Sequence, residues 1–486
     1  MEELKKRILE LETISKDLDP PETVRNGYNR RIMQYADDYL GHLERSKAFS
    51  GEKVWAERFA IDGEASPIGE LIDIFSEEVA EKGIRPSSGG HLGFIPGGGI
   101  YASALADFLV DITNEYAGIY FSSPGAVEME HELLKWLKAI FRFPDHAVGN
   151  LTSGGSIATL IAFTAARDRH QIKSERIPKS VIYLSSQVHH CVNKAIRIIG
   201  LEDVIIRHIK LDANSRIDAR EFGEQVDSDQ RAGLNPFMVV ASAGTTDTGA
   251  VDPLEEIGKT ARENGLWYHI DAAYGGFFIL TGEKKHLFSG IEMADSLVVD
   301  PHKGLFMPFG IGAVLVKDRE AVFRSHHYTA NYMQDSVDPN APVNPSDVSP
   351  ELTKHFRALR MWLPLKLHGI KPFAACLEEK LFLTQYFRKR LVEIGFETGP
   401  EPDLSVSYFW FPSRGVDQDL FNERLMKSIH RDGRVFLSST KINGKFVIRM
   451  AILSFRTKLR TIDLAIEMIN EARIEVEKEL AAERYS

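Results

Sequence analysis

Between residues 96 and 370, short apolar runs alternate with segments of helical periodicity, and this alternation constrains the fold more than any other feature of the chain. The runs that read as strands are residues 180–185, 204–209, 238–243, 267–270, 296–299 and 311–316. A helix predicted over 128–143 places Met129, Leu133, Leu137, Ile140 and Phe141 on one face. Such alternation predicts an α/β fold with a mostly parallel sheet covered by helices on both sides. Sheets of this kind bind ligands beyond the carboxyl ends of their strands.

The two ends of the chain have a different pattern. Residues 1–95 read as polar helices interrupted at Pro20-Pro21 and again at 86–90. After Pro372 a smaller α/β unit follows, with strands at 406–411 and 446–453 and a closing amphipathic helix. With 486 residues the chain is too long to fold around a single hydrophobic core. We therefore expect an N-terminal helical segment (1–95), a large domain (96–370) and a small C-terminal α/β domain (371–486).

Composition narrows the possible partners. The net charge of −10 argues against a nucleic-acid partner. Two cysteines, Cys191 and Cys376, argue against a disulfide framework and for a reducing, cytoplasmic location. The N-terminus lacks the apolar core of a signal peptide, and no apolar run approaches the roughly 18 residues of a membrane helix.

Two motifs lie at predicted strand ends. Lys303 follows the strand at 296–299 and an Asp-Pro-His turn, where a surface lysine is the ordinary alternative. Asp271 lies in His-Ile-Asp-Ala-Ala-Tyr-Gly-Gly, directly after the strand at 267–270. A buried carboxylate needs a cationic partner, such as the protonated ring nitrogen of a flat bound heterocycle. A metal site using His269 and Asp271 is a second interpretation, although no further ligand cluster completes it. We predict no metal.

Two further motifs have the features of a ligand site. The run Thr-Ser-Gly-Gly-Ser at 152–156 precedes a helical segment, so its backbone N–H groups can bind an anion, or Ser156 can simply cap the helix. His189, after the strand at 180–185, can stack on a ring or be an ordinary structural histidine. No function is assigned to His326-His327. The polar, proline-rich stretch at 330–350 reads as a functional or disordered loop.

Together these motifs resemble those of the group II decarboxylases that depend on pyridoxal 5'-phosphate (PLP), the family of aromatic-L-amino-acid and glutamate decarboxylases. The resemblance covers nearly the whole chain and includes the segments at 123–130, 356–362 and 445–452. It implies the type I fold of PLP-dependent transferases, with a seven-stranded, mostly parallel sheet. It also implies a homodimer, to which the N-terminal segment contributes, with active sites shared between subunits.

The resemblance implies roles for individual residues. Lys303 would hold the cofactor as a Schiff base, Asp271 would bind the pyridine nitrogen, and His189 would stack on the ring. Tyr332, on the loop that relatives contribute from the neighbouring subunit, would act in catalysis. The remaining predicted cofactor-binding residues are Gly155, Ser156, Thr246, Ala273, Asp300 and His302.

Some positions depart from the aromatic-acid enzymes. Asp300 stands where they have asparagine beside the phosphate, and its charge would repel unless it is paired. Gly304 replaces a tryptophan. The stretch that lines the substrate side-chain pocket in relatives is Phe94, Ile95, Pro96 and Gly97 here. These departures keep the cofactor chemistry and leave the substrate side chain open.

The expected function is decarboxylation of an L-amino acid to its amine and CO2. An aldehyde-forming oxidative deaminase and a carbon–carbon lyase of the same fold are alternatives. A catalytically silent homologue that regulates a partner is a further alternative, which the presence of Lys303 and Asp271 disfavours.

Overall fold

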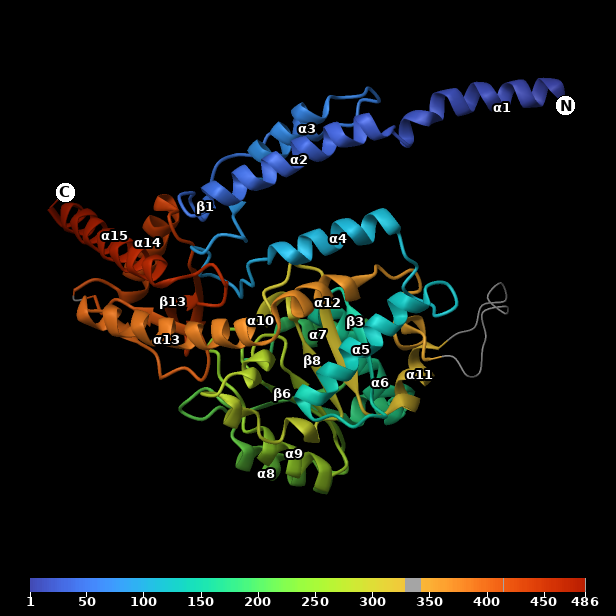
Figure 1. The fold of residues 1–486 in the computed structure, drawn as a ribbon. Helices are drawn as coiled ribbons and strands as arrows, with labels where there is room; N and C mark the ends of the chain where they lie inside the picture. Colours follow the sequence, from blue (N-terminus) through green and yellow to red (C-terminus); the bar gives the residue numbers. More distant parts are fainter. Residues whose placement is uncertain (328–341, 414, 486) are drawn as a thin grey trace.

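The computed structural model describes residues 1–327, 342–413 and 415–485, and its centre is a seven-stranded sheet (Figure 1). The strand order is β3-β9-β8-β7-β6-β4-β5. The pairs β4–β5, β4–β6, β6–β7 and β7–β8 are parallel, whereas β9 is antiparallel to both of its neighbours. The prediction of a mostly parallel seven-stranded sheet is confirmed. The strands are β3 (Val148–Thr152), β4 (Ser180–Ser185), β5 (Ile205–Ile209), β6 (Asn235–Ser242), β7 (Trp267–Asp271), β8 (Ser296–Val299) and β9 (Gly312–Val316).

Six of these strands were predicted from apolar runs, and β3 was not. β3 has the sequence Val-Gly-Asn-Leu-Thr, in which Gly149 and Asn150 interrupt the apolar pattern. Both interruptions have a tertiary cause. A Cβ at Gly149 would lie 2.8 Å from Leu134 Cδ2, so a side chain does not fit there. The amide of Asn150 is buried and donates to the Pro345 carbonyl at 2.8 Å.

Helices cover both faces of the sheet, and side chains alternate between the two cores with the period of two that strands impose. Tyr183, Val239 and Ile270 face one core with α5, α8 and α9, while Ile182, Val240 and Val298 face the other with α6, α7 and α11. The helices of this domain are α4 (Tyr101–Thr113), α5 (Pro124–Phe141), α6 (Gly155–Arg169), α7 (His190–Ile198), α8 (Ala219–Arg231), α9 (Leu254–Glu263), α10 (Pro301–Gly304), α11 (Arg319–His326) and α12 (Arg357–His368).

A second, smaller sheet lies towards the C-terminus, with strand order β10-β11-β13-β12 and antiparallel pairing throughout. Its strands are β10 (Glu397–Thr398), β11 (Val406–Trp410), β12 (Ser438–Ile442) and β13 (Lys445–Ala451). They share a third apolar core with α13 (Lys371–Glu393), α14 (Gln418–Asp432) and α15 (Leu459–Tyr485). Figure 1 shows this unit beside the central sheet.

The N-terminal helices extend away from the rest of the molecule (Figure 1). They are α1 (Glu2–Ser15), α2 (Glu22–His42) and α3 (Ile68–Phe75). The strands β1 (Phe49–Ser50) and β2 (Gly83–Ile84), which lie before and after α3 in the chain, pair antiparallel. None of these three helices has a buried residue. Among the described residues, no helix is both long and apolar enough to cross a membrane.

Candidate functional site

A cavity of about 260 Å³ opens where β3, β4, β6, β7 and β8 end at one edge of the central sheet. Parallel strands bring their carboxyl ends to the same edge, so residues far apart in sequence meet there. The nine residues predicted to bind the cofactor all line this cavity: Gly155, Ser156, His189, Thr246, Asp271, Ala273, Asp300, His302 and Lys303. Their individual roles remain predictions.

Lys303 lies in α10, the single turn of helix that follows β8. Its Nζ atom is 2.8 Å from Asp300 Oδ2, and the Asp300 side chain is only 2% exposed. Burial opposes the ammonium form, but the carboxylates of Asp300 and Asp271 more than offset it, so the pKa of Lys303 is raised above its usual range. The negative charge of Asp300 is therefore paired with Lys303, so it need not repel an anion bound nearby.

Asp271 is the last residue of β7 and lies within the same cavity. It is 8% exposed, and its Oδ1 atom accepts a hydrogen bond from the backbone N–H of Ala273 at 3.0 Å. This bond orients the carboxylate at the strand end. A buried carboxylate in this position can hold a cationic ring nitrogen. Among the residues that the structure describes, no group of three or more acidic, histidine or cysteine side chains is arranged to hold a metal ion.

The turn between β3 and α6 has the geometry of an anion site. Gly154 has φ of +155°, which glycine adopts readily, and α6 begins at the next residue. A Cβ at Gly155 would lie 2.9 Å from Asp300 Oδ2, so a side chain does not fit at this position. The 15-residue helix α6 therefore directs its N-terminal N–H groups at the cavity, where they can bind a phosphate.

Two histidines face the cavity as neutral rings. The pKa of His189 is lowered, chiefly by burial, and its Nδ1 accepts a hydrogen bond from the Cys191 backbone N–H at 3.2 Å. The proton of the neutral ring is therefore on Nε2. Burial also lowers the pKa of His302. The Nδ1 of His302 contacts the Ile311 carbonyl, which can only accept, so Nδ1 carries the proton and Nε2 is free to face the cavity.

Sequence analysis did not identify Arg449, which lies directly behind Thr246. Its Nε donates to the Thr246 carbonyl at 2.7 Å, and Nη1 donates to Ser438 Oγ at 3.1 Å. The other terminal nitrogen is buried without a partner, and burial lowers the pKa of Arg449 to about 10. A lone arginine within the apolar strand β13 was the available signal, because buried charges are rare. Cys191 and Tyr274 also line the cavity and had received no role.

The predicted side-chain pocket residues, Phe94 to Gly97, are not among those that line the cavity. Gly97 nevertheless touches the lysine turn, because a Cβ there would lie 2.1 Å from the His302 carbonyl oxygen. Phe94 is 56% exposed and packs its ring near Phe436. Their role in substrate selection stays a prediction. Tyr332 lies outside the described residues.

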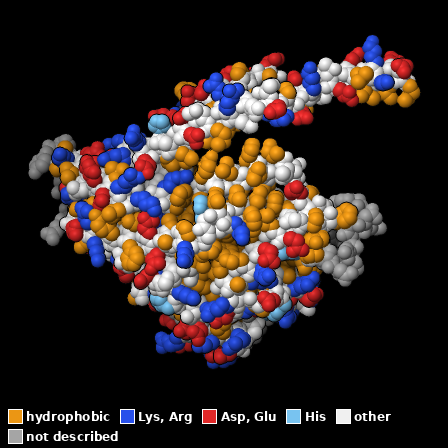
Figure 2. Space-filling view, in the orientation of Figure 1, with side chains coloured by type: hydrophobic (Ala, Val, Ile, Leu, Met, Phe, Trp, Pro, Cys, Tyr) orange, Lys and Arg blue, Asp and Glu red, His pale blue; other side chains and the backbone are white. Residues whose placement is uncertain are grey.

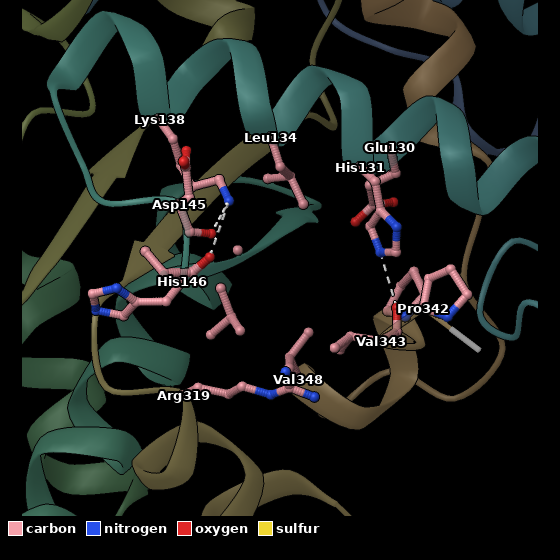
Figure 3. A pocket seen from close by; sticks show the side chains of 14 residues that line it. Glu130, His131, Leu134, Lys138, Asp145, His146, Arg319, Pro342, Val343 and Val348 are labelled. Carbon is pink, nitrogen blue, oxygen red and sulfur yellow. Dashed lines mark hydrogen bonds between the residues drawn. The ribbon is translucent and has the colours of Figure 1, made fainter. Parts of the chain in front are cut away.

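A second cavity, of about 280 Å³, lies near the opposite end of β3 (Figure 3). Lys138 projects from α5 beside it and donates to the carbonyls of Asp145 and Ala147 at 2.7 and 3.2 Å. The ring of His131 donates to the Val343 carbonyl at 2.9 Å. In the described part of the chain, no residue lining this cavity has a buried polar side-chain atom without a partner. In the first cavity, by contrast, Asp300 Oδ1 is buried without a hydrogen-bond partner.

Comparison with known proteins identifies a family. The model of the pyridoxal-dependent decarboxylase conserved domain matches residues 81–411. An aromatic-L-amino-acid decarboxylase of Bacillus atrophaeus is 33% identical over 372 residues, which are 75% of this chain and 77% of that protein. A phenylacetaldehyde synthase of Arabidopsis thaliana is 29% identical over 388 residues, which are 76% of this chain and 79% of that protein. The crystal structure of Oryza sativa TDC with PLP and tryptamine superposes with a TM-score of 0.88 at 22% identity, covering 94% of this chain and 99% of that one.

Proposed function

The chain belongs to the pyridoxal-dependent decarboxylase family, and we propose that it converts an L-amino acid to the corresponding amine and CO2, with Lys303 as the residue that carries the cofactor. Its cofactor is PLP. The observation that supports this proposal most directly is the meeting of Lys303, Asp271 and the Gly154–Gly155 turn in one cavity at the carboxyl edge of the sheet.

The residues present fit PLP. The turn at the start of α6 excludes side chains at Gly155 and offers backbone donors to a phosphate. Ser156 lies in the same cavity, and its hydroxyl can add a further donor to this site, whereas the unprotonated Nε2 of the neutral His302 ring can only accept a hydrogen bond. Asp271 supplies a buried carboxylate for the pyridine nitrogen, and Ala273 leaves room for a flat ring. Lys303 supplies the amine for a carbon–nitrogen double bond.

Bound PLP supplies an electron sink conjugated with the Cα atom of the amino acid, which delocalises the electron pair left behind when CO2 departs. The residues of the chain make that sink effective. Asp271 keeps a proton on the ring nitrogen through charge pairing. The neutral ring of His189 offers a flat surface for stacking, and its lowered pKa keeps it uncharged at neutral pH.

Arg449 places a positive charge in direct contact with the backbone of Thr246. Arg449 lies 203 residues after Thr246 in the sequence, and its Nε donates to the Thr246 carbonyl. Its second terminal nitrogen is buried and has no hydrogen-bond partner. A buried guanidinium in this position favours a carboxylate on the Thr246 side of the cavity. We therefore assign Thr246 and Arg449 to orienting the substrate, so that the bond to be broken stays aligned with the ring.

The experiment is a screen of L-amino acids for CO2 release and amine formation by the purified PLP-loaded protein, with Lys303→Ala as the matched control. The proposal expects at least one amino acid to give equal amounts of CO2 and amine with the wild type and neither with Lys303→Ala. Mass spectrometry after borohydride reduction should find the pyridoxyl group on Lys303. A pyridoxyl group on another lysine would disprove the assignment of Lys303.

Aldehyde formation is a second candidate, because a phenylacetaldehyde synthase is among the relatives of similar identity. The two outcomes differ in what reaches Cα after CO2 departs. If the Tyr332 hydroxyl returns a proton to Cα, the product is the amine. In its absence dioxygen competes for the electron pair. Tyr332→Phe should therefore lose amine and gain aldehyde, ammonia and hydrogen peroxide. Unchanged amine output would leave the proton donor unidentified, and aldehyde from the wild type would establish the second candidate.

We also infer a homodimer with shared sites. Exposed apolar side chains gather on the face over and around α4, below the N-terminal helices (Figure 2). Phe108, Ile112 and Phe121 are 53%, 70% and 70% exposed, which is unusual for large apolar residues of an isolated monomer. Light scattering should give twice the mass of 54.6 kDa. Mixing Lys303→Ala with Tyr332→Phe should restore part of the amine-forming activity if subunits exchange and each site uses both chains.

A further inference from the structure

The carboxylate of Asp300 is buried beside Lys303 with an incomplete set of partners. Its Oδ2 atom is 2.8 Å from Lys303 Nζ and 3.7 Å from His302 Nε2. Its Oδ1 atom is buried and has no hydrogen-bond partner. A buried carboxylate with one oxygen unsatisfied is costly, so the contact with Lys303 is its main compensation.

The surrounding backbone holds this carboxylate in place. A Cβ at Gly155 would approach Oδ2 to 2.9 Å, and one at Gly312 would approach Oδ1 to 2.7 Å. The Asp300 backbone N–H donates to the Ala273 carbonyl at 3.2 Å, and the Lys303 N–H donates to the Asp300 carbonyl at 2.9 Å. Asp300 is therefore fixed between β8, β9 and the turn before α6. The long, flexible lysine side chain is the partner that adapts.

The groups around the Lys303 nitrogen differ in charge. Asp300 and Asp271 are acids that favour a positive nitrogen. His189 carries a lowered pKa and is neutral, as is the neighbouring Cys191, because burial raises the pKa of its thiol to about 12. His302, with its pKa lowered by burial, is neutral too. The positive charge on the lysine nitrogen is thus stabilised by the two carboxylates, of which Asp300 is in direct contact.

We propose that Asp300 is a positioning residue for the proton on the Lys303 nitrogen, and that it keeps this proton in place both on the free lysine and after the nitrogen has bonded to PLP. This inference rests on the proposed function. The ammonium and the aldehyde give a protonated carbon–nitrogen double bond and one water molecule. Two of the three nitrogen protons leave with the carbonyl oxygen, and the third stays with the positive charge, facing Asp300. Asparagine, which aromatic-acid relatives carry here, has the same shape without the charge.

A protonated carbon–nitrogen double bond is the form that an incoming amino group attacks, because the charge makes its carbon electrophilic. Because its negative charge stabilises the proton on this nitrogen, Asp300 keeps the carbon–nitrogen double bond protonated, and therefore reactive, up to a higher pH. An opposite charge in contact shifts an ionisation by about one to three pH units. Asp300→Asn should shift the transition of the lysine nitrogen downwards by that amount.

The test follows the visible absorption of the PLP-loaded protein across the pH range in which the protein stays folded. Asp300→Asn should lower the midpoint of the spectral transition by about one to three pH units. Cys191→Ser, which alters an uncharged neighbour, is the matched control and should leave the midpoint within a few tenths of a pH unit. An unchanged midpoint in Asp300→Asn overturns the proposal.

A second measurement needs no cofactor. In the cofactor-free protein, the rate of reductive methylation of Lys303 is followed against pH by mass spectrometry. Asp300→Asn should make Lys303 reactive at lower pH than in the wild type, and an identical profile overturns the proposal even if the variant binds PLP poorly. Failure of the proposed function would look different, because borohydride would then fix the pyridoxyl group to another lysine in both proteins.

Discussion

Two lysine–carboxylate pairs, Lys354–Glu130 and Lys303–Asp300, differ in their burial and in their hydrogen bonds. Lys354 is completely buried, and its Nζ lies 2.5 Å from Glu130 Oε1 and 3.0 Å from Asn150 Oδ1. Glu130 Oε1 also accepts the Leu151 backbone N–H at 2.9 Å. Lys303, in contrast, is 23% exposed to the cavity, and its partner Asp300 keeps one oxygen unpartnered.

The pKa values of the two lysines diverge accordingly. At Lys354, burial outweighs the attraction of Glu130 and lowers the pKa. At Lys303, the nearby acids outweigh burial and raise the pKa. Lys354 therefore belongs to a structural pair, in which the lysine is completely buried and bonded to both Glu130 and Asn150. Lys303 belongs to a pair whose lysine stays open at a cavity and keeps capacity for a ligand.

The largest expected effect is the loss of turnover when Lys303 is replaced. Lys303→Ala removes the single lysine among the described residues that line the cavity, so turnover should fall by at least about 10⁴-fold. Stopped assays for CO2 and amine measure this loss. Denaturant unfolding of the same cofactor-free variant should show a smaller loss of stability than Lys354→Met, because water can enter the open cavity and solvate Asp300. A larger loss than at Lys354 would refute the distinction.

The next effect concerns the carboxylate opposite the lysine. Asp271→Ala removes the carboxylate that we propose as the partner of the protonated ring nitrogen, so kcat should fall by about 10³-fold while PLP stays bound. Steady-state kinetics measure kcat, and the visible band reports bound cofactor. Asp271→Asn, which keeps the shape, is the matched control for packing and should lose nearly as much. A near-normal kcat in either variant would contradict the role of Asp271.

At the structural pair, the expected effect is on folding. Lys354→Met leaves Glu130 buried without its cation, which should lower the free energy of unfolding by about 3–5 kcal/mol. Adding Glu130→Gln removes the orphaned charge and keeps an acceptor for the Leu151 N–H. The double variant should therefore recover part of the loss, as measured by urea unfolding. Equal losses in the single and double variants would show that the charge is not the cause.

The smallest effect concerns acid stability. His269 precedes Asp271 on the same strand, but it lies inside the core, where its Nδ1 contacts Ser296 Oγ at 2.8 Å and burial lowers its pKa to about 3. Its unfolded pKa is about 6.5, so between these values the unfolded chain binds more protons. The contribution of the buried, neutral His269 to the free energy of unfolding is therefore complete above about pH 6.5 and is lost as the pH falls towards about 3.

From pH 7 to pH 5 the loss attributable to His269 should be about 2 kcal/mol. His269→Asn has no group that titrates in this range and can keep a contact with Ser296. Denaturant unfolding at both pH values should therefore show a shallower pH dependence in the variant. An equal loss of unfolding free energy in the two proteins would show that His269 does not cause the pH dependence.

Much of the fold was accessible from the sequence because its signals are local. Periodicities of 2 and 3.6 are set by neighbouring residues, so six central strands and α5 were found with boundaries off by only a few residues. β3 was missed because its central Gly149 and Asn150 interact with distant segments. The candidate site was recognised through motifs at strand ends, and the parallel sheet brings those ends together.

The sequence by itself determined the class of fold, the family and the residue types that meet at the sheet edge. Only the tertiary structure decided which charges are paired and which are left open. It placed Arg449 behind Thr246, across 203 residues, and Lys354 on Glu130, across 224. It also gave Asp300 a partner in Lys303 and left one of its oxygens without any. Charge pairing depends on distance and burial in three dimensions, and no pattern along the chain encodes those directly.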